Sequence, residues 1–300
     1  MDQINIINSY EVSGYDTRVK ELYSDLLPKH ALSFLQRVSI TSKHFLGRPY
    51  VLSALGEGAE GLFDQRPLYR FDAFDCVTFI NTVLALAKAY DLQSFKDYLQ
   101  KFTYIDGKVS YLTRNHFISS DWNINNAQQG FVRDITAEVA GEGNVRKAMT
   151  IIDKPAWFQH HRLSNIYLSS SLSHDKQQML LQDLQALSKQ VIAKKIETPY
   201  LPITAMFDED QKPKKEIFNR FPDVCLIEIV RPDWEMKAKV GTNMNISHVG
   251  FVVRDLGTGN LILRHASQVQ KCVVDVSLQE YLLERLPSPT IKGVNVQALL

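Results

Sequence analysis

The stretch Asp75-Cys76-Val77-Thr78-Phe79-Ile80 opens the clearest helix pattern in the chain, which continues to Lys88. Apolar side chains recur there at the spacing of one helix face, namely Cys76, Phe79, Ile80, Val83, Leu84 and Ala87. Asp75 stands directly before them, and aspartate is among the best residues at an N-cap. The pattern predicts a buried helix whose first residue is Cys76.

Further helices are predicted on both sides of this stretch. Residues 15–46 have the spacing of one or two amphipathic helices that break near Pro28, because proline disrupts a helix interior. Residues 173–196 predict another helix, with Ser173 as its cap. Mixed, turn-rich sequence lies between these helical segments.

The last third of the chain has the pattern of strands. Apolar or alternating stretches separated by turns lie at residues 224–230, 247–254, 260–267, 272–276 and 294–296. The capping box Ser277-Leu278-Gln279-Glu280 predicts a short helix to Leu286 among them. Helices followed by antiparallel strands predict an α+β fold.

Composition excludes several classes of protein. The 300 residues are 45% hydrophobic and 22% charged, which is ordinary for a globular protein. Lys and Arg number 34 against 33 Asp and Glu, and this balance argues against a generic nucleic-acid or polybasic membrane binder. No apolar run reaches the roughly 18 residues that a bilayer-spanning helix needs. The first twenty residues are charged and lack an apolar h-region, so no signal peptide is visible.

Cys76 allows two interpretations. A buried cysteine on an apolar stripe is commonly a small core residue. At a helix N-terminus, however, unpaired backbone N–H groups and the helix dipole favour the nucleophilic thiolate. Asp72 and Asp75 oppose this effect, because nearby negative charge raises the pKa of a thiol, so activation would need a general base. Position alone leaves both interpretations open.

Two histidines on the predicted strands could supply that base. In residues 247–254 and 260–267, the two-residue period of a strand puts His248 and Gly250 on one face of the first strand, and His265 on one face of the second. A turn at Gly257-Thr258 would make paired residue numbers sum to 515, which places Gly250 opposite His265. A shift by two would place His248 directly opposite His265. In either register the two imidazoles share a face and contact each other.

A helix-start cysteine with two histidines is the composition of a cysteine hydrolase. The segment Phe74-Asp75-Cys76-Val77-Thr78-Phe79 resembles the cysteine motif of the NlpC-type, papain-like cell-wall hydrolases. Ser247-His248-Val249-Gly250-Phe251 resembles their histidine strand, and His265-Ala266-Ser267 their third catalytic position. The chain is most similar to the bacterial branch described as N-acetylmuramoyl-L-alanine amidase-like, from about Tyr50 to Val296.

The resemblance implies a papain-like (NlpC-type) α+β fold, with the cysteine-bearing helix packed on a mostly antiparallel sheet. It implies a helical N-terminal segment at 1–47, a catalytic domain at 48–300 and a large family-specific insertion at about 92–222. It also implies a triad in which Cys76 attacks an amide carbonyl to form a thioester, His248 is the base and His265 orients His248. Peptidoglycan is the implied partner and substrate.

Six further residues are predicted to contact the substrate: Tyr69, Arg70, Asn115, His116, Asp121 and Trp122. Trp122 is expected to stack on a sugar, and Arg70 to pair with a peptide carboxylate. A turn-rich loop whose polar side chains cap their own backbone is the alternative for residues 115–122. The glycine-rich loop 56–61 lacks the strand and helix of a phosphate-binding loop.

No metal site and no cofactor are predicted. His160, His161 and His174 match no zinc-ligand spacing, and no His-Glu-x-x-His pattern occurs. Cys225 and Cys272 lie on predicted strands and are expected to be buried, unpaired thiols, since three scattered cysteines make no disulfide framework.

The predicted reaction is hydrolysis of the amide that joins the lactyl group of muramic acid to L-alanine. Two alternatives stay open: a γ-D-glutamyl cell-wall endopeptidase, and a catalytically silent peptidoglycan-binding module. A thiol with two imidazoles counts against the silent module. The resemblance implies a periplasmic or secreted protein, although a cytoplasmic location stays open without a visible signal peptide, and the sequence leaves the oligomeric state open.

Overall fold

The computed structural model describes residues 9–26, 32–169 and 171–300, and it divides into two compact units. The first unit contains the described parts of Met1–Arg114, with Leu163–Leu180 and Ala266–Val273. The second contains Asn115–Arg162, Leu181–His265 and Val274–Leu300. The predicted boundary between residues 47 and 48 stays a prediction.

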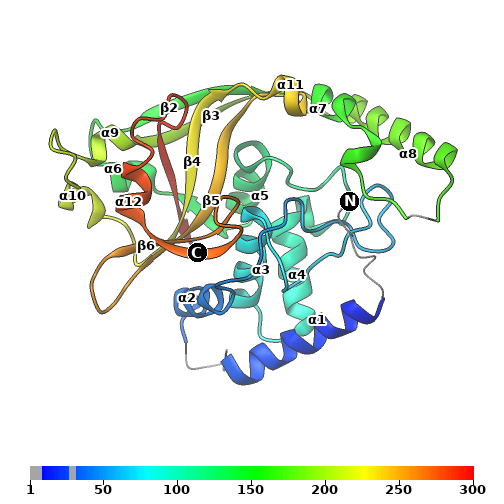
Figure 1. The fold of residues 1–300 in the computed structure, drawn as a ribbon, viewed down its shortest axis with the longest axis horizontal. Coiled ribbons are helices and arrows are strands. Elements are labelled where there is room, and N and C mark those ends of the chain that lie inside the picture. Colours follow the sequence, from blue (N-terminus) through cyan, green and yellow to red (C-terminus); the bar gives the residue numbers. More distant parts are fainter. Residues whose placement is uncertain (1–8, 27–31, 170) are drawn as a thin grey trace. The chain divides into compact units, whose positions relative to one another are not determined.

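The first unit is helical. Its helices are α1 (Ser9–Glu21), the π-helical turn η1 (Leu22–Leu26), α2 (Phe34–His44), α3 (Cys76–Lys88), α4 (Leu92–Thr103) and the 3-10 turns η2 (Ile105–Gly107) and η4 (Leu163–Asn165). Helix α3 packs against both α2 and α4 (Figure 1). The helices predicted within 15–46 are therefore confirmed where the structure describes them, whereas the break predicted at Pro28 lies outside the described residues.

Both ends of α3 are fixed by side chains. Asp75 Oδ1 accepts a hydrogen bond from Thr78 N at 2.8 Å, and Thr78 Oγ1 accepts one from Asp75 N at 2.9 Å. This capping box starts the helix at Cys76, as predicted. At the other end Arg37, which is buried, donates from Nε to Ala87 O at 2.7 Å. The guanidinium thus satisfies carbonyls that the end of a helix leaves without intrahelical partners.

The second unit is built on an antiparallel sheet. The strands of the sheet are β1 (Val132–Asp134), β2 (Arg146–Ile152), β3 (Lys194–Pro202), β4 (Val224–Trp234), β5 (Met244–Arg254), β6 (Leu261–Ser267), β7 (Cys272–Ser277) and β8 (Gly293–Leu299). The end of β6 and the start of β7 are counted with the first unit. The strand order is β2-β3-β8-β4-β5-β6-β7, and β1 also pairs with β8. Every pair with a defined register is antiparallel. The prediction of a mixed helix-and-strand fold with an antiparallel sheet is confirmed.

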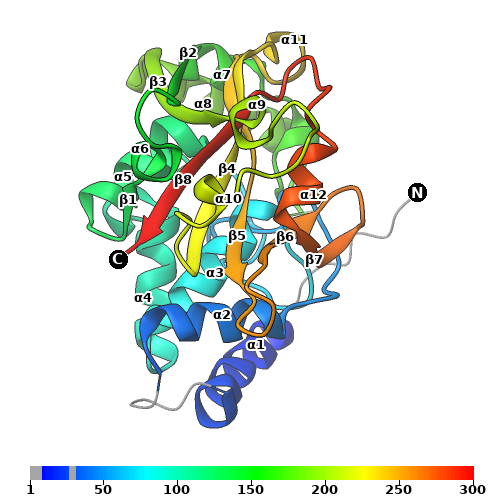
Figure 2. The same cartoon turned by 90° about the vertical axis from the view of Figure 1, so that its left-hand side faces the viewer.

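Strand β8 lies between β3 and β4 rather than at an edge of the sheet (Figure 2). Residues 92–222, predicted to be a family-specific addition, supply β1, β2 and β3 on that side of β8. The sheet therefore consists of a meander from β4 to β7, and β8 joins this meander to β3 and β2.

The two faces of this sheet differ in polarity because side chains alternate along each strand. Ile227, Ile229 and Val294 lie on a face that packs in an apolar core with residues of the short helices. Glu228 and Asn295, which are strand partners, lie on the opposite face and are fully buried. The short helices of this unit are the π-helical turn η3 (Ile118–Trp122), α5 (Asn123–Gln128), α6 (Thr136–Ala140), α7 (Lys154–His160), α9 (Ile203–Met206), α10 (Lys215–Phe218), α11 (Lys237–Val240) and α12 (Leu278–Leu283).

The helix predicted at 173–196 is too long. Helix α8 covers only His174–Ala186, with Ser173 Oγ accepting a hydrogen bond from Lys176 N at its start, and a 3-10 turn, η5 (Leu187–Gln190), follows. Residues from Lys194 onward form β3 because they pair with β2 over seven positions, and such pairing outweighs local helical spacing. The helix after Ser277 likewise ends at Leu283 instead of Leu286.

Within the described ranges, no helix combines the length and apolar character needed to cross a membrane.

Candidate active site

Two histidines contact each other directly in the second unit. Nε2 of His248, on β5, lies 2.7 Å from Nδ1 of His265, on β6, and the two rings are nearly perpendicular at 80°. Strands β5 and β6 pair Phe251 with Arg264 and Val252 with Leu263, so paired numbers sum to 515. The predicted register is therefore confirmed, and His248 is the diagonal neighbour of His265. The turn is longer than predicted, because β5 ends at Arg254 and β6 begins at Leu261.

Gly250 makes this contact possible. A Cβ atom at position 250 would lie 2.8 Å from Cβ of His265, closer than real side chains approach. Glycine therefore lets the His265 side chain cross over β5 toward His248. The motif Ser247-His248-Val249-Gly250 has a steric reason for its glycine.

The surroundings of both imidazoles lower their pKa values and so favour the neutral forms. Burial lowers the pKa of His248, and the neighbouring His265 and Arg285 lower it further. Burial also lowers the pKa of His265; Arg285 adds to this effect, whereas Asp275 opposes it. Neutral imidazole is the form that can accept a proton, and the same lowering of the pKa makes it a weaker base.

Aromatic and cationic side chains cover the pair. The ring of Tyr281, on α12, lies 5.5 Å from that of His265 between centroids. The guanidinium carbon of Arg285 lies 3.3 Å from the Tyr281 ring centroid. Neither residue was predicted from the sequence, because neither lies on a histidine strand and neither belongs to a recognised motif.

Cys76 lies in the first unit, at the first position of α3, and its residue is half-buried. It forms no disulfide. Tyr50, which bridges to Phe74, lies close enough to Cys76 and Asp75 that their negative charges would raise the pKa of its phenol, which burial already raises. Tyr50 was not predicted as a site residue, because only the bridge between residues 50 and 74 brings it beside the cysteine.

The other two cysteines differ from each other. Cys225 is fully buried on β4, as predicted, and burial raises the pKa of its thiol. Cys272 begins β7 and is only half-buried, with Sγ 3.4 Å from Gln270 O, so the prediction of a buried thiol is wrong there.

Tyr69 and Arg70, predicted to contact the substrate, make contacts within the first unit. Tyr69 is buried, donates a hydrogen bond to Asp16 and packs edge-on against Phe95. Arg70 donates from Nε to Asp72 Oδ1 at 2.8 Å. These contacts are structural, and the predicted roles toward substrate stay predictions.

The four predicted residues of the 115–122 segment lie in the second unit and are not equally accessible. His116 is half-buried, with its ring 4.5 Å from that of Trp157, and Asn115 is buried. Asp121 is buried and pairs with Lys154 Nζ at 2.8 Å. Trp122 has no exposed surface, so the prediction that it stacks on a sugar does not agree with its burial. An indole in the protein interior offers no face to a ligand, and the contacts predicted for the other three stay predictions.

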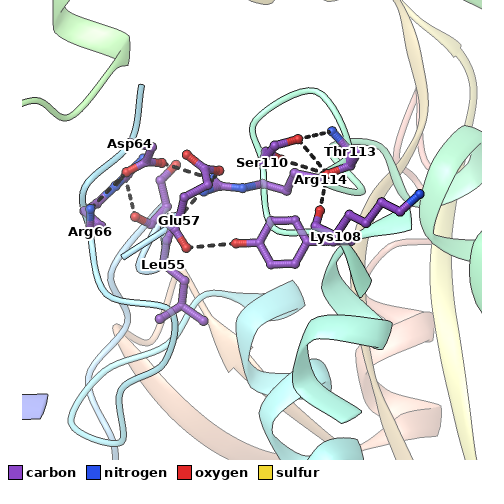
Figure 3. A network of polar contacts seen from close by, with 11 residues as sticks. Leu55, Glu57, Asp64, Arg66, Lys108, Ser110, Thr113 and Arg114 are labelled. Atoms are coloured by element: carbon purple, nitrogen blue, oxygen red, sulfur yellow. Dashed lines mark hydrogen bonds and ion pairs between the residues drawn. The ribbon is translucent and has the colours of Figure 1, made fainter. Parts of the chain in front are cut away.

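A buried ion network in the first unit explains the glycine-rich loop (Figure 3). Arg66 binds both oxygens of Asp64, at 2.7 and 2.5 Å, and Arg114 binds Asp64 at 3.0 Å and pairs with Glu57. Burial raises the pKa of Glu57 to about 7, although Arg114 opposes the effect. A Cβ at Gly56 would lie 2.4 Å from Asp64 Oδ1. The glycine thus serves the close approach of a structural carboxylate.

Comparisons with known proteins agree with this architecture. A crystal structure of a protein from Legionella pneumophila matches with a TM-score of 0.92 and 38% identity, covering 98% of this chain and 97% of the other. A crystal structure described as an N-acetylmuramoyl-L-alanine amidase from Bacteroides uniformis matches with a TM-score of 0.59 and 22% identity, covering 89% of this chain and 99% of the other. At this identity the second likeness concerns the fold alone.

No curated protein matches the chain. The model of one family, described as AmiA-like, N-acetylmuramoyl-L-alanine amidase-like, matches residues 40–290. This match covers most of the chain, including Cys76 and both histidines. The chain belongs to the N-acetylmuramoyl-L-alanine amidase-like family.

Proposed function

We propose that the protein is a peptidoglycan amide hydrolase of papain-like, NlpC-type fold that works through a cysteine nucleophile. The observation that carries the proposal is the 2.7 Å contact between Nε2 of His248 and Nδ1 of His265, two imidazoles whose pKa values are lowered by burial. The half-buried thiol of Cys76 at a helix start supports it. Two imidazoles in direct contact, in a chain that also carries a helix-start cysteine, are the groups that a thiol hydrolase uses as base and orienting residue.

The proposed reaction has two halves. Nδ1 of His248 takes the proton of the Cys76 thiol while the sulfur attacks the amide carbonyl, and His265 holds the ring in position. The tetrahedral intermediate then expels the amine, which takes the proton back from His248, and a thioester remains. Water, deprotonated by His248, attacks the thioester to release the carboxylic acid and return the proton to sulfur. The proposal requires Cys76 Sγ to reach His248 Nδ1 during turnover.

A helix start offers one donor for the oxyanion. The backbone N–H of Cys76 is the first of α3 and has no carbonyl one turn before it within the helix. Such a donor, aimed at the developing negative charge, is worth roughly 10²–10³ in rate in known acyl-transfer enzymes. The proposed bond is the one between the lactyl group of muramic acid and L-alanine.

Digestion of purified muropeptides, followed by mass spectrometry, tests the function. Cleavage at the lactyl amide releases an intact peptide that begins with L-alanine and leaves a sugar without amino acids. Cleavage by a γ-D-glutamyl endopeptidase instead leaves L-alanyl-D-glutamate on the sugar. Unchanged muropeptides at high enzyme concentration, with binding retained, would assign the protein to the silent binding module.

The proposed substrate lies outside the cytoplasmic membrane, so we also propose that the protein is exported. Fractionation of the producing cells, with marker enzymes for each compartment, tests this location. Recovery of the protein only with cytoplasmic markers would contradict export.

A further inference from the structure

Two arginines lie beside the histidine pair. Arg231 is on β4, two residues beyond Ile229, which is the strand partner of His248. The strand pairing shifts its register at Val230, but Tyr281 and Arg285, which lie beside the histidines, both act electrostatically on Arg231. The guanidinium carbon of Arg231 lies 4.4 Å from the centroid of the Trp234 ring, so Trp234 packs against one side of the guanidinium.

Arg285 lies in the connection between β7 and β8. It follows α12, and its guanidinium lies over the ring of Tyr281, the residue that packs against His265. The charge of Arg285 acts on both histidines and on Arg231, so the four groups occupy one neighbourhood.

Among the residues that the structure describes, no buried carboxylate pairs with either of these two cations. Within the described part of the chain Arg231 makes no ion pair, and its buried Nε has no hydrogen-bond partner. Arg285 reaches Glu284 at 3.4 Å, but that carboxylate is 75% exposed and adjacent in sequence. Asp275 is already held by Arg264 through two contacts of 2.7 and 2.8 Å. Two partly buried guanidinium groups whose charges repel each other are costly, and an anion bound near both would lower that cost.

We propose that Arg231 and Arg285 together bind a carboxylate of the peptide part of the substrate. Guanidinium forks match the two oxygens of a carboxylate, and partial burial strengthens each charge-assisted hydrogen bond. This inference rests on the proposed function for the identity of the ligand, since the peptides of peptidoglycan carry free carboxylates. The bound anion would also hold the peptide beside His248.

Calorimetric titration of the Cys76→Ala protein tests the site without turnover. The ligand is N-acetylmuramoyl-L-alanyl-D-glutamate, and the comparison ligand is its diamide, in which both glutamate carboxylates are amidated. The Cys76→Ala protein, which keeps both arginines, should bind the dicarboxylate at least about tenfold more tightly than the diamide. This comparison requires no arginine variant and so does not depend on the folding of one.

Variants then assign the effect to residues. Arg231→Gln and Arg285→Gln should each raise Kd for the dicarboxylate about tenfold and leave Kd for the diamide unchanged, and Arg285→Lys should recover part of the loss. Arg254→Gln is the matched control, because Arg254 is a half-buried arginine of β5 that pairs with Asp223 at 2.9 Å. Circular dichroism and melting temperatures verify that each variant is folded.

Three results would overturn the inference: equal affinity for the two ligands, glutamine variants that bind like the parent, or inorganic phosphate that displaces the dicarboxylate at equal concentration. Failure of the proposed function has a different signature. A protein that binds the dicarboxylate through these arginines but cleaves no muropeptide retains the site and loses the hydrolase assignment. A protein that cleaves muropeptides without any dependence on Arg231 or Arg285 loses only the site.

Discussion

His248 and His265 share one hydrogen bond between neutral rings, so a single proton decides which nitrogen of His248 can act as a base. If His248 donates from Nε2, its Nδ1 keeps a lone pair and can accept a thiol proton. If His265 donates from Nδ1, His248 carries its proton on Nδ1 and cannot accept another. The first arrangement protonates Nε2 of His265, which is buried and has no hydrogen-bond partner among the described residues. The proposed reaction therefore requires the tautomer in which His265 carries its proton on the buried Nε2.

Two substitutions of His265 should show whether its role is to accept the hydrogen bond from His248 or only to fill space beside it. His265→Asn retains an amide oxygen that can accept from Nε2 of His248, so we expect a loss of about tenfold in kcat/KM. His265→Ala removes the acceptor and should cost roughly 10³-fold or more, as misoriented catalytic imidazoles do. Initial rates of muropeptide hydrolysis, with melting temperatures as the control, measure both. Wild-type rates in His265→Ala would show that the orienting group lies elsewhere, and Asn115 or His116 would be the next residues to replace.

Cys76 should be the thiol that an alkylating reagent blocks. Iodoacetamide should abolish hydrolysis in proportion to the labelling of Cys76, read by mass spectrometry of peptides. Buried Cys225 should label last, and Cys272→Ser should leave the rate unchanged. Cys76→Ala should lose hydrolysis while it keeps its melting temperature within a few degrees. Inhibition by a chelator that zinc reverses would contradict the cysteine mechanism.

Asp75 should affect both the stability of α3 and the reactivity of Cys76. Asp75→Ala removes the N-cap bond to Thr78 N and should lower the free energy of unfolding by about 1 kcal/mol. Asp75→Asn retains an acceptor at the cap but removes the charge, so it should preserve stability and speed alkylation of Cys76, because negative charge disfavours a thiolate. Denaturant melts and alkylation rates separate the two effects. Equal alkylation rates in Asp75→Asn and the wild type would mean that the carboxylate does not influence the thiol.

The pH profile should lack the acid limb of an ordinary histidine. Burial, His265 and Arg285 lower the pKa of His248, so the base stays unprotonated well below the pKa of about 6.5 of a free imidazole. We expect kcat/KM to hold on acidification through pH 6.5 and to fall only at lower pH, where His248 gains a proton. Arg285→Gln removes one cation that lowers the pKa of His248, so the fall should move toward higher pH. Asp275, which raises the pKa of His265, is unchanged in this variant. A fall centred at pH 6.5 in the wild type would contradict the neutral, desolvated pair.

Glu228 should make the fold less stable as pH rises. Burial raises its pKa to about 8, although Asn123 donates a hydrogen bond to it at 3.0 Å. Between the unfolded pKa of about 4.3 and about 8, the folded protein binds a proton that the unfolded chain does not, so the free energy of unfolding falls with rising pH. Glu228→Gln removes this titration and should flatten the dependence between pH 5 and 8. Denaturant melts of both proteins across that range, with Glu235→Gln as an exposed control, test it; parallel curves would show that Glu228 titrates normally.

Strong local signals made part of this structure predictable. Asp75 and Thr78 specify the start of α3 through bonds between residues three apart, and these can be read directly from the sequence. The contact between His248 and His265 followed from the two-residue period of the strands and the position of one turn. Both inferences use geometry that neighbouring residues determine by themselves.

The remaining features depend on pairings between distant segments. Lys194–Pro202 has a helical pattern before it, yet it becomes a strand because β2 pairs with it. Trp122 looked like a ligand platform beside polar neighbours, and its complete burial is a property of packing. Arg231 on β4, Tyr281 on α12 and Arg285 just after α12 act on one another near the histidines. No pattern in the sequence relates these three residues.

The position of β8 in the sheet also bears on how the protein is made. Val294 and Val296 pair with Ile229 and Ile227, and Val294 also pairs with Leu201. During synthesis, β3 and β4 therefore leave the ribosome long before the strand that must separate them. Until residues 293–299 emerge, two strand edges with unpaired backbone groups stay exposed, and such edges invite pairing with other chains. The nascent protein should consequently depend on chaperones or slow release until its last strand is inserted.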